Sequence, residues 1–242
     1  MAYETFALVY DEVMDDSLYQ KWLDFSIRHL PAANRNLLEL ACGTGALAVA
    51  FAKAGFSVTG LDLSEEMLML AQNRALAENA EIQLIAGDML DLTDIGTYQA
   101  VTCFSDSLCY MKNQEQVLQV FQGVFDLLED EGVFIFDVHS LYQMDTVFPG
   151  YSFHDQTENF AFLWDSYAGE VPHSIEHFLT FFVKEGEYFD RIDELHQERT
   201  YSLETYQALL KKAGFQSEVY ADFEDAGPNE TSKRWFFVCH KH

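Results

Sequence analysis

The chain has 242 residues, of which 49% are hydrophobic and 15% aromatic, which is enough for one large α/β unit with a substantial core. Its formal net charge of −26, with only 14 scattered Lys and Arg residues, makes nucleic acid an improbable partner, because binding it requires a concentrated basic surface. No apolar run approaches the ~20 residues that span a bilayer. The N-terminus also lacks the basic and apolar regions of a secretory signal, so neither membrane insertion nor export is expected.

The cysteines show no paired spacing and are expected to be reduced, mostly buried thiols of a cytoplasmic protein; they are Cys42, Cys103, Cys109 and Cys239. His173 and His177 have a spacing that would suit a metal on a helix. They fall in a segment predicted as strand, next to Pro172, so no metal site is expected.

Strands and helices alternate along the first part of the chain. Residues 1–30 have helical spacing of apolar residues, and Pro31 ends that segment. The pattern then predicts strands at 36–41, 57–62, 81–85, 99–104 and 132–138, and helices at 46–54, 65–78 (capped by Ser64) and 113–129. This alternation indicates right-handed crossovers and a largely parallel sheet.

The pattern changes between residues 141 and 200, where aromatic and β-branched residues alternate with polar ones and turn signals separate the runs. Such a segment predicts antiparallel hairpins. A helix at 203–213, ended by Gly214, and strands at 216–221 and 234–240 then resume the first pattern. We therefore expect a core of residues 1–140 and 201–242, with 141–200 as an inserted β-rich lid that covers the substrate.

The segment Leu37–Ala46 carries the most information about function. An apolar strand ends near Glu39, and a turn with Gly43 and Gly45 leads into a helix. Asp62 ends the next strand. This arrangement is typical of a site for an adenosine-containing cofactor. Gly43-x-Gly45-x-x-Ala48 also satisfies a dinucleotide fingerprint, although no Tyr-x-x-x-Lys proton relay of a dehydrogenase occurs in the chain.

Three motifs together resemble the class I S-adenosylmethionine-dependent methyltransferases. Residues 39–45 (ELACGTG) are similar to the first motif of that family, (D/E)-x-(G/A)-x-G-x-G. Residues 62–68 (DLSEEML) and 87–89 (GDM) are similar to its second and third motifs. The resemblance covers residues 36–140 and 202–240. It implies a Rossmann-like, doubly wound α/β fold with a seven-stranded sheet whose last strand is antiparallel, and S-adenosylmethionine as the cofactor.

The resemblance also implies a role for individual residues. Glu39, Ala41, Gly43 and Gly45 should surround the methionine moiety, and Asp62 should bind the ribose. The adenine should lie against Leu63 and Met67, with Asp88 at its amino group and Met89 beside the ring. Phe104 and Ser105 should lie near the sulfonium. Tyr10 and Trp22 belong to an N-terminal segment that resembles a helix closing over the cofactor.

The expected function is methyl transfer to a small molecule, with an amine or carboxyl-bearing metabolite preferred. An RNA or protein methyltransferase, a non-catalytic S-adenosylmethionine sensor and a nicotinamide oxidoreductase are the alternatives. No motif identifies a catalytic residue, the substrate or the oligomeric state. His139 could be a general base or a supporting polar residue, and His154 and His196 could line a substrate pocket or belong to the lid's own core. Glu198, Arg199 and Tyr201 could form an ion-paired hinge.

Overall fold

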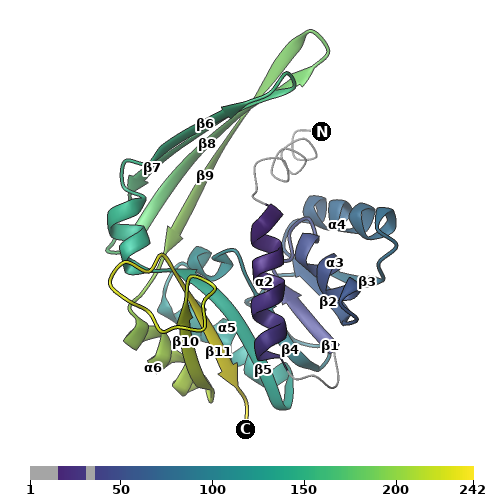
Figure 1. Ribbon diagram of the computed structural model, residues 1–242, viewed down its shortest axis with the longest axis vertical. Coiled ribbons are helices and arrows are strands. Elements are labelled where there is room, and N and C mark those ends of the chain that lie inside the picture. The colour runs from purple at the N-terminus through teal and green to yellow at the C-terminus, as the bar shows by residue number, and fades with distance from the viewer. Residues whose placement is uncertain (1–15, 31–35) are drawn as a thin grey trace.

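The structure, a computed structural model, describes residues 16–30 and 36–242. Its core is a seven-stranded sheet in the order β10-β11-β5-β4-β1-β2-β3 (Figure 1). The strands are β1 (Asn36–Leu40), β2 (Ser57–Asp62), β3 (Ile82–Ala86), β4 (Tyr98–Cys103), β5 (Leu128–His139), β10 (Gln216–Ala221) and β11 (Arg234–His240). Strand β11 runs antiparallel to both of its neighbours, β10 and β5. The predicted fold class, including the antiparallel last strand, is confirmed.

Helices cover both faces of this sheet. They are α2 (Asp16–His29), α3 (Ala46–Lys53), α4 (Glu65–Ala77), α5 (Gln114–Leu127) and α6 (Leu203–Ala213), with short helical turns η1 (Ser107–Tyr110) and η2 (Gln143–Val147). Neighbouring strand residues alternate between the two faces. Leu37 and Phe236 pack with α2 and α3, whereas Leu38 and Phe237 pack with α5 and α6.

Local signals set the helix ends as expected. The Ser64 hydroxyl accepts the Met67 N–H at the start of α4, and Gly214 ends α6 in the left-handed region at φ 111°. One boundary differs: β5 begins at Leu128 rather than at residue 132. Leu128 pairs with Tyr98 before an irregularity shifts the register, and the acidic residues that follow hid this start from a pattern of apolar residues.

A separate antiparallel sheet is made of β6 (Ser152–Gln156), β7 (Phe160–Ala168), β8 (Ser174–Glu185) and β9 (Tyr188–Arg199), in that order. In Figure 1 it rises from the side of the core where β5 and β11 lie and leans over the molecule. All four strands fall within residues 141–200, and we refer to this sheet as the lid. One face of it carries a small apolar cluster of Phe160, Phe162 and Phe181, against which Met67 of α4 packs. Of the helices in the described ranges, none has the length and apolar character needed to cross a membrane.

Candidate active site

The turn between β1 and α3 has a left-handed backbone at three positions, with φ of 54° at Ala41, 54° at Gly43 and 74° at Gly45. The two glycines serve different purposes. A Cβ on Gly45 would lie 2.7 Å from the Cβ of Ala71, so this glycine allows α3 and α4 to pack closely. A Cβ on Gly43 would meet nothing within 4 Å, which leaves its backbone open to approach by a ligand.

Asp62, at the end of β2, stabilises this turn through hydrogen bonds. Its Oδ2 accepts the Gly43 N–H at 2.7 Å, and its Oδ1 accepts the Ser64 N–H at 2.9 Å. An ionised carboxylate has about four acceptor positions, so each oxygen can still accept a hydrogen bond from a ligand. The single side chain thus fixes the turn and keeps acceptors for hydroxyl groups.

Glu39 is buried at the end of β1, and its Oε2 has no hydrogen-bond partner among the described residues. Burial, and then the nearby charge of Asp62, raise the pKa of Glu39 well above its usual range. The side chain borders a small cavity of about 50 Å³, which we call the first cavity. Its lining includes six of the predicted site residues: Trp22, Glu39, Ala41, Gly43, Phe104 and Ser105.

The other predicted residues lie outside the lining of the first cavity. Leu63 is largely exposed, and Met67 packs against the lid cluster. Asp88 accepts the Leu90 N–H at 2.9 Å, and Met89 packs on the main core. These residues follow the ends of β2 and β3 in the chain. Tyr10 lies outside the residues that the structure describes.

A strained turn follows β4. Ser105 and Asp106 both have a left-handed backbone, with φ of 55° and 51°. Each such non-glycine conformation costs about 1–3 kcal/mol and persists only where the surroundings impose it. Here the Asp106 N–H donates to Asp137 Oδ1 at 3.0 Å, and Phe104 stacks on Trp22 with ring centroids 6.1 Å apart. The turn therefore holds Ser105 and Asp106 in one fixed orientation at the carboxyl end of the sheet.

Asp137 and Arg234 form the centre of a buried polar network. Asp137 Oδ2 accepts the indole N–H of Trp22 at 2.8 Å and an Arg234 N–H at 2.6 Å. The other end of the guanidinium pairs with Asp106 Oδ1 at 2.7 Å. Burial opposes the charge of Arg234, but the two carboxylates outweigh it and raise the pKa of Arg234.

A second cavity, of about 320 Å³, lies between the core and the lid. The core contributes the carboxyl ends of β4 and β5, and the lid contributes the inward-facing residues of β7, β8 and β9. Its lining includes Trp22, Ser105, Asp106, His139, Phe148, Phe162, Trp164, His177, Phe181, His196, Glu198 and Arg234. Trp22 and Ser105 line both cavities, so the two cavities adjoin each other at this pair of residues.

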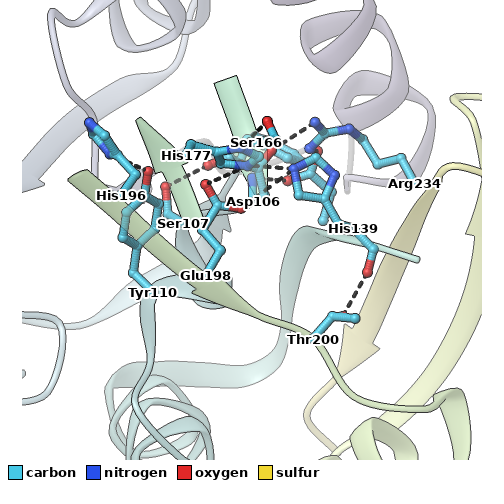
Figure 2. Close-up of polar contacts among 12 residues, drawn as sticks. Asp106, Ser107, Tyr110, His139, Ser166, His177, His196, Glu198, Thr200 and Arg234 are labelled. Atoms are coloured by element: carbon cyan, nitrogen blue, oxygen red, sulfur yellow. Dashed lines mark hydrogen bonds and ion pairs between the residues drawn. The ribbon is translucent and has the colours of Figure 1, made fainter. Parts of the chain in front are cut away.

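Ionisable groups of the second cavity face one another across the core and the lid (Figure 2). His139 Nε2 lies 3.2 Å from Asp106 Oδ2 and 3.7 Å from Glu198 Oε2. Although burial alone would raise it, the charges of His139 and Arg234 hold the pKa of Asp106 well below its usual range. Burial and the charge of Asp106 raise the pKa of Glu198 to about 7.

One ligand atom from each of Asp106, His139 and Glu198 falls within 4.8 Å of the others, a spacing that could hold a cation. The Arg234 guanidinium already occupies the Asp106 side of this group. The two histidines considered from their spacing, His173 and His177, bond different partners. His173 bonds Asp145 at 2.7 Å, whereas His177 is buried and bonds Ser166 within the lid.

His139 and His196 both line the second cavity, whereas His154 is exposed on β6. Asp106 falls in the segment 104–107, which the sequence places at the carboxyl end of the fourth strand, facing the cofactor crevice. Asp137 and Arg234 are not indicated by any motif, and Glu198 is indicated only as part of a hinge. Asp137 has a signal that could have been read: a carboxylate inside an apolar strand must find a buried partner. The identity of that partner, Arg234, depends on the pairing of β5 with β11.

Comparisons with known proteins agree with this geometry. Residues 37–132 match the family model described as "Methyltransferase domain". The whole chain is 42% identical to a protein of Geobacillus sp. (strain WCH70) over 100% of both sequences, and 42% identical to YqeM of Bacillus subtilis (strain 168) over 98% of that protein; both are named as methyltransferases.

Among solved structures, the fold matches a S-adenosylmethionine-dependent methyltransferase from Clostridium acetobutylicum ATCC 824 with a TM-score of 0.86. The two chains are 27% identical, and the match covers 100% of this chain and 99% of the other. The full-length relatives, the matching domain and the shared fold place the chain in one family. It belongs to the class I S-adenosylmethionine-dependent methyltransferases.

Proposed function

We propose that this enzyme transfers the methyl group of S-adenosylmethionine to a small molecule bound in the second cavity. The observation that carries the proposal is the adjacency of the two cavities, which share Trp22 and Ser105. A donor in the first cavity and an acceptor in the second would meet at these two residues. Methyl transfer is an in-line displacement, so alignment of this kind can supply roughly 7–11 kcal/mol of the catalytic effect.

The residues of the first cavity fit the amino-acid end of S-adenosylmethionine. Glu39 Oε2 is a buried acceptor without a partner among the described residues, and the ammonium group of the cofactor would satisfy it. The open backbone of Gly43 allows close approach. Asp62 would accept the ribose hydroxyls, and the adenine would lie along Leu63, Met67, Asp88 and Met89.

The size of the second cavity favours a small acceptor over a macromolecule. Strands of the lid form one of its walls, and the net charge of −26 disfavours RNA. The volume of about 320 Å³ leaves room beside Ser105, whereas a non-catalytic sensor would have this space filled by lid side chains. A cytoplasmic location is part of the proposal and is supported by the four buried, free cysteines.

Transfer of label from methyl-labelled S-adenosylmethionine tests the proposal. The enzyme is incubated with an extract of cells, and ultrafiltration separates small molecules from proteins and RNA. We expect label in the small-molecule fraction, and we expect Asp62→Ala to abolish it. Asp91→Ala, which changes an exposed carboxylate away from both cavities, is the matched control. Label confined to the macromolecular fraction would rule out the proposed acceptor class.

A further inference from the structure

Two carboxylates, Asp106 and Glu198, line the second cavity beside the guanidinium of Arg234. Asp106 shares that guanidinium with the buried Asp137, so Arg234 is already paired with two carboxylates, whereas Glu198 has no Lys or Arg partner among the described residues. Arg234 is the one Lys or Arg among the described residues that line the cavity. A buried carboxylate is costly unless it is closely paired and hydrogen-bonded, so a cationic ligand on Glu198 would complete this site.

Glu198 is the carboxylate with an oxygen available to such a ligand. Its Oε2 is buried and has no hydrogen-bond partner among the described residues. His139 Nε2 lies 3.7 Å from Oε2, and His177 Nε2 lies 3.9 Å from Oε1. Both distances exceed a hydrogen bond.

The two neighbouring histidines present N–H groups on the sides that face the carboxylates. His177 Nδ1 lies 3.0 Å from the indole Nε1 of Trp164, which can only donate, so Nδ1 accepts and the ring is neutral with its proton on Nε2. Burial lowers the pKa of His177 to about 4, in agreement with that arrangement. His139 Nε2 donates to Asp106, which stays ionised beside Arg234. Of these groups, Glu198 is therefore the one with a free acceptor.

Glu198 is also connected to the surface. The Tyr110 hydroxyl lies 2.8 Å from His196 Nδ1 (Figure 2). The same hydroxyl is a hydrogen-bond donor to the Glu198 carboxylate, which partly offsets the rise that burial causes in the pKa of Glu198. A proton on Glu198 lets the carboxyl group donate to Tyr110 and Tyr110 donate to His196. A proton on His196 reverses both bonds. The side chain of His196 is 25% exposed, so the chain of bonds leads from the buried carboxylate to water.

The walls of the cavity suit an organic cation better than a metal ion. Phe148, Phe162, Trp164 and Phe181 line it, and aromatic faces attract cations that carry apolar substituents. A divalent metal would instead require several oxygen or nitrogen ligands, and Asp106 is already bound to Arg234.

We propose that the methyl acceptor is an amine that enters the second cavity as an ammonium ion, pairs with Glu198 Oε2, and gives up its proton to that oxygen before attack. This inference rests on the proposed function and names its substrate class.

The reaction begins with a proton transfer. The ammonium N–H bond breaks and Glu198 becomes a neutral acid, which leaves a lone pair on nitrogen. That pair attacks the methyl carbon, the C–S bond breaks, and the sulfur keeps the bonding electrons. The products are an N-methylammonium ion and S-adenosylhomocysteine, and the proton leaves Glu198 through Tyr110 and His196.

Binding of a probe amine tests the inference without knowledge of the natural substrate. Calorimetry compares benzylamine with benzyl alcohol on the enzyme saturated with S-adenosylhomocysteine, in EDTA so that metal ions do not compete. We expect benzylamine to bind at least about tenfold more tightly, because only the ammonium forms a charge-assisted bond with Glu198. Equal affinities of the two probes would overturn the inference.

Glu198→Gln should remove the preference for benzylamine while leaving the affinity for S-adenosylhomocysteine unchanged, which shows that the variant is folded. Glu176→Gln, on the same sheet but half-buried, bonded to Gln197 and outside the lining of the second cavity, is the matched control and should keep the preference. A Glu198→Gln enzyme that still prefers benzylamine would refute the assignment to Glu198.

The pH dependence gives an independent readout. Because Glu198 must be ionised to pair with the amine and its pKa is raised to about 7, benzylamine affinity should increase as the pH rises through that value. Tyr110→Phe removes a donor that favours the ionised form, so it should move the midpoint to higher pH. The groups that face Glu198 are Asp106, Cys109, Tyr110, His139, His177 and His196. Glu198→Gln distinguishes Glu198 from these groups. If the pH dependence of benzylamine affinity persisted in that variant, another group would be its cause and the inference would be contradicted.

An acceptor recovered from the labelled extract separates the two proposals. A small molecule methylated on oxygen or carbon would preserve the proposed function and overturn the amine inference. Label that appears only in protein or RNA would overturn the proposed function itself.

Discussion

The carboxylate of Asp137 accepts hydrogen bonds from three separate segments: Trp22 on α2, Arg234 on β11, and the backbone of Asp106 after β4. Asp137→Ala would leave the guanidinium of Arg234 buried with one carboxylate instead of two. It would also leave the Trp22 N–H without its acceptor. Breaking a buried pair of this kind typically costs about 3–5 kcal/mol. We expect a loss of that size in the free energy of unfolding, measured by urea denaturation.

Asp137→Asn keeps an acceptor oxygen and should lose less than Asp137→Ala. Asp193→Ala removes an exposed partner of Arg191 and should leave the urea midpoint unchanged. A midpoint for Asp137→Ala equal to that of the wild type would show that Arg234 is held by Asp106 alone.

At the scale of elements, the two glycines of the turn from β1 into α3 have different roles: Gly45 allows α3 and α4 to pack closely, and Gly43 leaves room for a ligand. Gly43→Ala and Gly45→Ala both place an alanine in the left-handed region, at a backbone cost of about 1–2 kcal/mol each. Only the Gly45 variant adds a clash, with Ala71 of α4. Of the two glycines, Gly43 lines the first cavity and Gly45 does not. We therefore expect Gly45→Ala to lose more stability and Gly43→Ala to lose more affinity for S-adenosylhomocysteine.

Urea denaturation and calorimetry on the same two variants provide both readouts, and each variant is the control for the other. The reverse order, with Gly43→Ala the less stable and Gly45→Ala the weaker binder, would contradict the roles assigned to the two glycines.

At the scale of the whole molecule, the sequence predicted the parts whose signals are local. Glycine turns, caps such as Ser64, and the alternation of strands and helices are each confined to a short segment, so the core sheet and the position of Glu39 and Gly43 followed from them. The network around Asp137 could not be predicted in this way. It joins residues from α2, β5, β11 and the turn after β4, and their meeting depends on the order of the strands in the sheet. Glu198 illustrates the limit: its neighbours in sequence suggested a hinge, whereas its carboxylate lines the second cavity.

The charge of the whole molecule also has a consequence for stability. With 40 acidic and 14 basic residues, repulsion among surface carboxylates opposes folding, since unfolding moves like charges apart. Salt shortens the screening length from about 30 Å at 0.01 M to about 10 Å at 0.1 M, which weakens this long-range repulsion more than it weakens the buried pairs of Arg234. The urea midpoint at pH 7 should therefore rise as sodium chloride is added. Most of the rise should occur below about 0.1 M, where the screening length changes most. A midpoint that falls over this range would mean that surface ion pairs such as Arg28 with Asp225 outweigh the net repulsion.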